Sequence, residues 1–408
     1  MISTRTNIEN TQAAATSPTP RNPWVRSPTW DGCWILNTLW LAPIAWWLAR
    51  GQEDPSSTNL FWIYLVLSFC FWIGHRLSST YLAYCTPAYR PLLRSQRVRF
   101  VWLPLGIVIA VFAILLPADD ALPWSRATRS MYLVIIDYGL ITYHFASQHF
   151  GFLRLYRVRA GQARSEHARR IDRVYALVIG GLMVFVAESV TGTVFFQDVW
   201  LDPVFDPVWL TRHFEEIRWC STAFVAFATA GMLVAEFRDE HPSFPLALYV
   251  ICMAAIVVAA FFVTPYVFVV LWTSQHWLAA MGLAIVVART EGADADAAQQ
   301  PSAWYRLWGA VSRRPWALTL VLVALSALLL PIMEVEALDV GEPGFAEKVV
   351  PAFANALSNS AWVQALVAIG FVTAFLHYAL DRAVYRFRDP EVRHAARGLF
   401  EARMQGGK

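Results

Sequence analysis

The sequence predicts an all-α fold: a polytopic integral membrane protein of about ten transmembrane helices, with both termini in the cytoplasm. Three observations predict this fold. The 408 residues are 57% hydrophobic and 15% charged, whereas about 25% of residues are charged in ordinary globular proteins. Apolar runs, most of them near the length needed to cross a bilayer, follow one another along the chain. Lys and Arg gather in alternate connecting segments, as they do in cytoplasmic loops.

The apolar runs are separated by segments that carry Pro, Gly and charged residues, as loops do. Pro265 separates the seventh run from the eighth and predicts a tight turn between them. In chain order the runs are 33–49, 60–83, 101–117, 130–154, 174–196, 219–237, 244–263, 266–288, 316–333 and 361–380.

The arginines orient these runs. With the N-terminus inside, 26 of the 33 Lys and Arg residues fall in cytoplasmic segments and six fall in outer segments, while Arg76 lies within a helix. The segment 334–360, between the last two runs, is acidic. We therefore expect a multi-pass protein of the inner (plasma) membrane, with the lipid bilayer as its surroundings.

Three regions are expected along the chain. Residues 1–30 are polar and predict a disordered cytoplasmic tail, 31–388 form one helical transmembrane domain, and 389–408 form a basic cytoplasmic C-terminal tail. The five cysteines include no CxxC pair, which excludes a thiolate metal site and c-type haem attachment. No basic segment is interleaved with stacking aromatics on a soluble domain, so nucleic-acid binding is not expected.

Residues 130–156 carry polar side chains where a membrane span is expected: Asp137, His144, Gln148 and His149. A central Asp costs about 2.5–3.5 kcal/mol on insertion scales, so such groups persist where they face the protein interior. At about 100° per residue, Asp137, His144 and Gln148 share one helix face, and His149 points about 140° away from His144. The spacing predicts that His144, rather than His149, faces the same cavity as Asp137 and Gln148.

Five histidines fall in predicted spans that run from outside to inside: His75, His144, His149, His276 and His377. At about 1.5 Å per residue, four of them lie roughly 15–24 Å from the start of their helix, between the midplane and the inner half of the bilayer. We therefore expect His75, His144, His276 and His377 to converge, with His149 as a possible fifth member. A hydrogen bond from each ring to a neighbouring helix is the plainer alternative.

Asp381 follows His377 by four residues, so a carboxylate and an imidazole share one helix face. Such a pair binds a metal directly, or the carboxylate orients the ring. Pairing of Asp381 with Arg382 or Arg386 is the alternative.

Clustered imidazoles without thiolates suit iron, copper or zinc. Non-haem iron on three or four histidines is the first candidate, and copper or a haem held by two facing histidines are the others. Asp137, Gln148 and Tyr138 are the candidate catalytic residues, and Trp272 and Tyr143 are candidates to line the cofactor cavity. A non-haem metal site and a haem site would both place redox chemistry beside the lipid. A lipid-soluble small molecule would reach such a site laterally, from the bilayer.

Two segments resemble the bacterial Brp/Blh membrane β-carotene dioxygenases. Ser147-Gln148-His149-Phe150-Gly151 resembles their S-x-x-H-F-G run with one residue fewer, and residues 265–276 resemble their P…Y-F-x-x-W-H-S-x-x-H segment with one histidine instead of two. His75-Arg76 stands in place of their H-G-x-x-D. The resemblance covers two of the ten predicted helices and implies a membrane oxygenase that holds iron on four histidines and acts on an apolar polyene.

Two other classes of protein fit the same residues. A proton- or ion-coupled transporter uses intramembrane His, Asp and Glu, usually between two repeated halves, but no internal repeat is visible here. A membrane assembly protein without chemistry is the third class. Metal content distinguishes the enzyme from both, because the enzyme is expected to retain a stoichiometric redox metal or haem.

Overall fold

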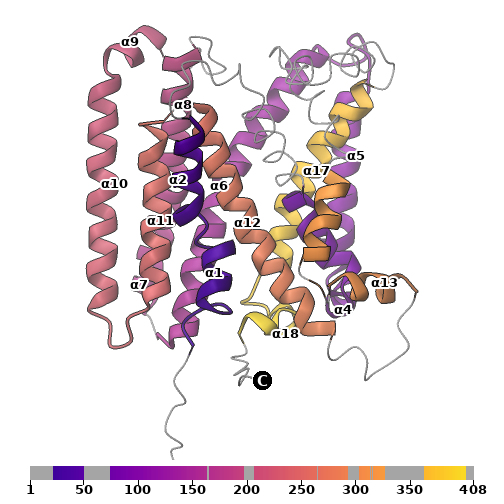
Figure 1. Cartoon of the computed structure of the whole chain (residues 1–408). Coiled ribbons are helices and arrows are strands. Elements are labelled where there is room, and N and C mark those ends of the chain that lie inside the picture. Colours follow the sequence, from indigo (N-terminus) through magenta and orange to yellow (C-terminus); the bar gives the residue numbers. More distant parts are fainter. Residues whose placement is uncertain are drawn as a thin grey trace, which may run out of the picture.

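The protein is described by a computed structural model that covers residues 22–49, 74–162, 165–196, 206–263, 265–292, 303–312, 314, 316–326 and 363–400. Within these ranges every regular element is helical (Figure 1). The N-terminal part holds α1 (Pro28–Trp34), α2 (Thr38–Ala49), a helical segment 74–85, α4 (Arg90–Ser95), η3 (Val98–Trp102), α5 (Leu103–Leu115), α6 (Arg126–Ala160), α7 (Glu166–Leu177), η4 (Val178–Leu182) and α8 (Met183–Phe196). The remainder holds α9 (Pro207–Arg212), α10 (Phe214–Phe237), α11 (Phe244–Ala260), α12 (Pro265–Gly292), α13 (Ala303–Ser312), a helical segment 316–326, α17 (Val363–Val384) and α18 (Pro390–Ala395).

Helix boundaries follow from local chemistry. The hydroxyls of Ser125, Ser165 and Ser243 each accept a hydrogen bond from a backbone N–H in the first turn of α6, α7 and α11, which satisfies donors that a helix leaves unpaired at its start. Gly161 ends α6 with a φ of 78°, a left-handed conformation that glycine adopts without steric cost. Pro265 begins α12 immediately after the turn that follows α11.

The described residues hold five helices that are long and apolar enough to cross a membrane. They are Val98–Leu115, Glu166–Thr191, Phe214–Phe237, Leu271–Ala288 and Gln364–Val384. Shorter apolar helices occur at Phe244–Ala260 and Trp316–Ser326. The all-helical fold with several candidate membrane spans is therefore confirmed. The count of ten spans is not tested, because the predicted runs 60–83, 316–333 and 361–380 extend beyond the described residues.

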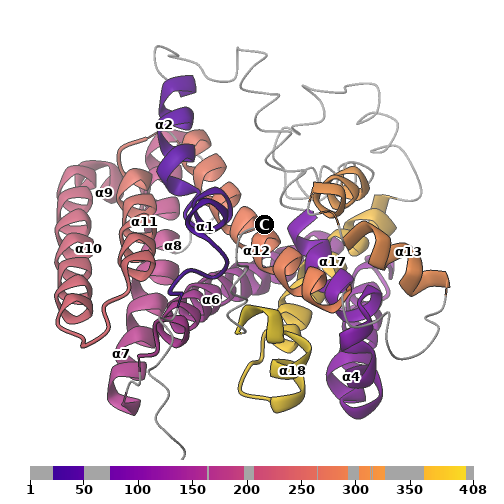
Figure 2. The same cartoon turned by 60° about the horizontal axis from the view of Figure 1, so that its bottom comes forward.

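Two helices lie between two groups of helices. Figures 1 and 2 show α6 and α12 running obliquely through the middle, with α10 and α11 on one side and α5 and α17 on the other. In the apolar stretch Leu271–Ala288 of α12, 94% of the residues are buried. In the apolar stretches of Val98–Leu115 and Phe214–Phe237, only 22% of the residues are buried. Hence α12 is the central helix, and α5 and α10 present broad apolar faces to the outside.

Each group has its own apolar contacts. A small cluster joins α5, α6 and α17 through side chains such as Val111, Leu133 and Phe371. The main core joins the N-terminal helices to α6–α8 and α10–α12. Gly282 of α12 permits close approach to α1, because a Cβ there would lie 2.6 Å from the Cβ of Trp34.

Parts of both predicted tails belong to the folded structure. Asp31 accepts hydrogen bonds from the backbone N–H groups of Val25 and Arg26 at 2.8 and 3.1 Å, so ordered contacts begin before residue 31. At the other end, α18 buries Val392, and Leu399 is also buried. The tail predicted over residues 389–408 therefore includes a packed helix, and residues 1–21 and 401–408 lie outside the described residues.

Candidate metal centre

Four buried histidines from four separate helical segments meet between α6, α12 and α17. His75 comes from the segment 74–85, His144 from α6, His276 from α12 and His377 from α17. One ring nitrogen from each lies within 4.8 Å of the corresponding atom of the other three. This set is called the histidine cluster below, and its convergence agrees with the common depth that the sequence indicates.

The Nε2 atoms face one another. His276 Nε2 lies 2.9 Å from His75 Nε2 and 3.1 Å from His144 Nε2, and His144 Nε2 lies 3.1 Å from His377 Nε2. A neutral imidazole nitrogen carries either one N–H or one lone pair, so it serves one partner in the plane of its ring. Two of these nitrogens therefore face more neighbours than they can satisfy by hydrogen bonding. A cation among them is coordinated by all four lone pairs, so the cluster can hold a metal ion.

Polar groups lie beside the outer ring nitrogens of two of the four histidines. His377 Nδ1 lies 3.1 Å from the hydroxyl of Ser79, and the ring is also hydrogen-bonded to the backbone of Arg76. His144 Nδ1 lies 4.0 Å from Asp381 Oδ2. Because ligating histidines are usually oriented through their second nitrogen, these contacts match a set of rings that present Nε2 to a metal.

Asp381 contacts a different histidine from the one that its spacing indicates. It lies four residues after His377, but its carboxylate faces His144 across the interface between α17 and α6. It is also outside the group of atoms close enough to share one ion. The geometry therefore fits the expectation that Asp381 orients a ring better than the expectation that it is a ligand.

The shared face of α6 is arranged as its spacing predicts. Gln148 donates through Nε2 to the carbonyl of His276 at 3.4 Å, and Asp137 is hydrogen-bonded to Tyr378. The Tyr378 ring lies 5.2 Å from the ring of His144, centroid to centroid. Asp137, His144 and Gln148 thus all point toward α12 and α17.

His149 lies on the opposite side of α6 and outside the histidine cluster. Its Nδ1 is 2.7 Å from the hydroxyl of Tyr249 on α11. Gly180 leaves room for the ring, because a Cβ at that position would lie 2.6 Å from His149 Cδ2. The possible fifth member of the cluster is therefore a packing histidine that joins α6, η4 and α11.

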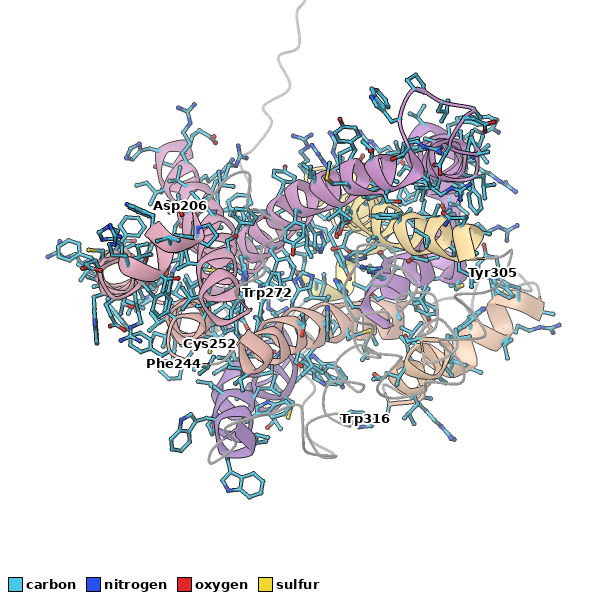
Figure 3. The ribbon with its side chains drawn as sticks, turned by 90° about the horizontal axis from the view of Figure 1, so that it is seen from above. Asp206, Phe244, Cys252, Trp272, Tyr305 and Trp316 are labelled. Atoms are coloured by element: carbon cyan, nitrogen blue, oxygen red, sulfur yellow. The ribbon has the colours of Figure 1, made fainter. Side chains whose placement is uncertain are left out.

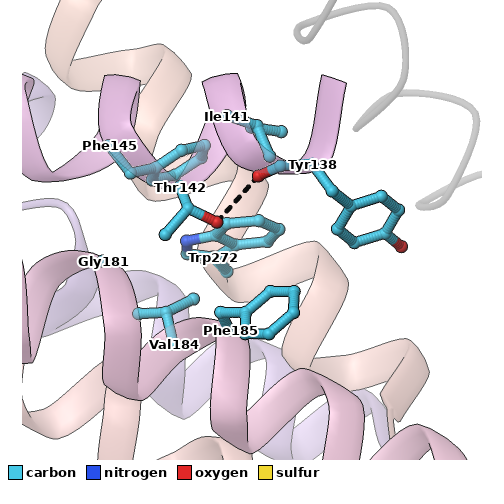
Figure 4. A pocket seen from close by; sticks show the side chains of 8 residues that line it. All are labelled: Tyr138, Ile141, Thr142, Phe145, Gly181, Val184, Phe185 and Trp272. Atoms are coloured by element: carbon cyan, nitrogen blue, oxygen red, sulfur yellow. Dashed lines mark hydrogen bonds between the residues drawn. The ribbon is translucent and has the colours of Figure 1, made fainter. Parts of the chain in front are cut away.

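Three other candidate residues lie away from the four imidazoles. Tyr143 is exposed, with the guanidinium of Arg382 5.8 Å from its ring centroid. Tyr138 and Trp272 line a small pocket between α6, η4, α8 and α12 (Figure 4). Seen from above, Trp272 lies near the middle of the bundle (Figure 3), one helical turn before His276.

Phe145 connects that pocket to the histidine cluster, and the sequence reasoning missed it. Its ring stacks on His276 with centroids 3.8 Å apart and on Trp272 with centroids 4.3 Å apart. Its position next to His144 in the sequence was the available signal, although a neighbour about 100° around the helix is not expected on the same face.

Comparisons of the chain with models of protein families, curated proteins and solved structures found no match.

Proposed function

We propose that this chain is a multi-pass inner-membrane oxidoreductase in which His75, His144, His276 and His377 bind a redox metal. Non-haem iron is the preferred metal, and the substrate is a lipid-soluble molecule. The observation that carries the proposal is the inward-facing arrangement of four buried Nε2 atoms from four helical segments. Haem and copper are the other candidates for the same ligands.

The spacing of the nitrogens favours a metal with more than four coordination positions. With metal–nitrogen bonds of about 2.0–2.1 Å, ligands at 90° lie about 2.9 Å apart and tetrahedral ligands lie about 3.3–3.4 Å apart. Neighbouring Nε2 atoms of the cluster lie 2.9, 3.1 and 3.1 Å apart, which is nearer to the spacing of ligands at 90°. Iron with four nitrogen ligands keeps further positions for reactants.

The surroundings support a lipid-soluble substrate. The cluster lies among helices with broad exposed apolar faces, and all eight residues that line the adjoining pocket are uncharged. Oxidation is favoured over metal-assisted hydrolysis because the nitrogen spacing is nearer to that of a six-coordinate metal such as iron than to that of tetrahedral zinc. Asp137, paired with Tyr378 beside His144, is proposed to hold a proton for the reaction.

We further propose ten spans, and the positions of the basic segments support the placement of both termini inside. Elements that carry or adjoin the arginine-rich segments, including α4, α13 and α18, lie at one end of the bundle, and α9 lies at the other (Figure 1). Reporter fusions after Arg170 and after Gly344 are expected to report opposite sides of the membrane. Reports from the same side would contradict this topology.

Oxygen consumption tests the reaction. Protein in lipid nanodiscs is mixed with a lipid extract from its source cells, and oxygen uptake is recorded with an electrode. We expect uptake by the wild type and by His149→Gln, which alters a buried histidine outside the cluster, and loss of uptake in His276→Ala.

A proton-coupled transporter is the alternative function. Half-buried Asp137 and buried Arg76 and Asp381, which lie around the histidines, favour it. Equal oxygen uptake by wild type and His276→Ala would contradict the oxidoreductase. Proton flux into vesicles that requires Asp137, in a protein that binds no metal, would support the transporter.

A further inference from the structure

We propose that an arginine-lined pocket at the proposed cytoplasmic end of the bundle binds the phosphate of an anionic phospholipid headgroup. The chain that follows α17 forms this pocket from residues 387–390, α18 and η6 (Arg397–Leu399). Its charged and aromatic lining consists of Arg388, Arg393, His394 and Arg397, with Phe387 and Phe400. The cavity has a volume of about 400 Å³, and binding sites for small molecules have volumes of about 300–1,000 Å³. The pocket contains no member of the histidine cluster, so its test does not depend on a bound metal.

The lining of this pocket carries positive charge only. It includes three arginines and no carboxylate. A guanidinium can donate two parallel hydrogen bonds to phosphate oxygens, so clustered arginines are typical of phosphate sites. Arg388 and Arg393 are exposed, and neither of them forms an ion pair with a carboxylate among the described residues. Both guanidinium groups are therefore available to an anion that enters the pocket.

The acidic side chains of the same segment are directed to α4 and η3 instead. Asp389 accepts hydrogen bonds from the side chains of Gln96 and Arg99 at 2.9 and 3.2 Å. Glu391 accepts a hydrogen bond from the hydroxyl of Ser95 at 2.8 Å. Neither carboxylate lines the pocket. The segment therefore separates its charges, with the acids bound to a neighbouring helix and the bases left around the pocket.

The backbone that carries the basic side chains is fixed to the rest of the protein. Val392 of α18 and Leu399 of η6 are fully buried. The carboxylate of Asp389 accepts a hydrogen bond from the backbone N–H of Glu391 at 3.1 Å, which caps the start of α18. The guanidinium of Arg159 on α6 donates to the carbonyl of Leu399 at 3.4 Å. The pocket is therefore formed before a ligand binds, which reduces the entropic cost of binding.

The position of the pocket favours a lipid as the source of the phosphate. The candidate span Gln364–Val384 ends three residues before Phe387, so the pocket lies where the apolar part of α17 gives way to polar sequence. Figures 1 and 2 show α18 at the same end of the bundle as α4 and α13. Basic pockets at the cytoplasmic ends of membrane helices bind anionic headgroups. Phosphatidylcholine should bind less well, because its choline cation would be repelled by the arginines.

Native mass spectrometry of the detergent-solubilised protein tests this site, because it counts the lipids that each chain retains. The protein is titrated with phosphatidylglycerol and, in parallel, with phosphatidylcholine. The ionic strength is about 0.15 M, at which charges more than about 8 Å apart are largely screened. We expect one tightly retained phosphatidylglycerol per chain and weaker retention of phosphatidylcholine. The double variant Arg388→Gln/Arg393→Gln should weaken the binding of phosphatidylglycerol about 10- to 30-fold, because each basic side chain near an anionic headgroup contributes to binding.

Arg94→Gln/Arg97→Gln is the matched control, because both arginines are exposed in or next to α4 and neither lines the pocket. This variant loses the same charge and should bind phosphatidylglycerol as the wild type does. His394→Glu, which places a carboxylate in the pocket, should also weaken binding and decides the question if the first variant does not fold. Equal losses in the pocket and control variants, or equal retention of the two lipids, would overturn the proposal. Displacement of phosphatidylglycerol by inorganic phosphate at equal concentration would overturn the assignment to a lipid.

Discussion

Two buried polar clusters lie along α6, and their groups are satisfied in different ways. Toward its C-terminal end, Arg157 donates to both oxygens of Asp172 at 2.8 Å and to Glu236 and Gln162 at 2.7 Å. Gln162 and the backbone N–H of Ser243 complete the bonds to Glu236. We call Arg157, Gln162, Asp172 and Glu236 the ion-pair cluster. Donors and acceptors in it match within the chain.

In the histidine cluster, by contrast, like groups face one another. The Nδ1 of His75, the Oε1 of Gln148 and the Oδ1 of Asp381 have no hydrogen-bond partner among the described residues. Buried polar groups are normally paired, so an incompletely satisfied cluster indicates a group that comes from outside the chain. The comparison indicates that the ion-pair cluster stabilises the fold, whereas the histidine cluster could hold a metal ion.

The largest expected effect is on the ion-pair cluster. Arg157→Met removes the cation that joins two buried carboxylates, although Arg154 remains 3.9 Å from Asp172. The variant is expected to lower the free energy of unfolding by about 3–5 kcal/mol. Arg169→Met is the matched control, because its partner Glu166 is exposed and such pairs contribute about 0–1 kcal/mol. Unfolding temperatures in detergent measure both. A similarly small decrease in unfolding temperature in the two variants would show that the ion-pair cluster does not stabilise the fold.

Asp31, which also contacts the C-terminal part of α6, predicts a pH dependence. Burial raises its pKa from 3.8 to about 6, although it accepts hydrogen bonds from Val25, Arg26 and Tyr156. Between these two pH values the folded protein holds a proton that the unfolded chain has released. The contribution of the protonated Asp31 carboxyl to the free energy of unfolding is therefore fully present below about pH 4. It decreases by about 3 kcal/mol as the pH rises through about 6.

Unfolding temperatures of wild type and Asp31→Asn between pH 4 and 8 test this sign. The difference, wild type minus variant, should fall from pH 4 to about 7 and then stay constant. A difference that rises with pH would mean that Asp31 is stabilised as a carboxylate instead.

Asp381→Asn changes the histidine cluster without removing a proposed ligand. Loss of a carboxylate that orients a ligating histidine typically weakens metal affinity 10- to 100-fold. We expect this loss in a chelator competition titration, with the metal still bound at saturation. Unchanged affinity would leave Asp381 without a role in orienting His144.

His149→Gln should have the smallest effect and separates the buried histidines into two kinds. It replaces the contact with Tyr249 and is expected to cost about 0.5–1.5 kcal/mol of stability, measured as a shift in unfolding temperature. Metal content should remain at the wild-type level, because His149 lies outside the cluster. Loss of metal in this variant would contradict that separation.

Periodicity predicted much of this arrangement because it acts within one helix. The face shared by Asp137, His144 and Gln148, and the opposite direction of His149, follow from about 100° per residue. The depth of four histidines predicted that they converge. Contacts between helices could not be obtained in this way. Asp381 faces His144 rather than His377, and Phe145 stacks on His276, because these contacts depend on how α17 and α12 cross α6.

Metal analysis of the purified protein decides whether the histidine cluster binds a redox metal. Wild type, His149→Gln and His276→Ala are purified in mild detergent, and their metal content and optical spectra are recorded. Because the four histidines form one site, we expect about one redox metal ion per chain in the first two proteins and loss of that metal in His276→Ala. A wild type without iron, copper or haem, or a His276→Ala variant with full metal occupancy, would contradict it.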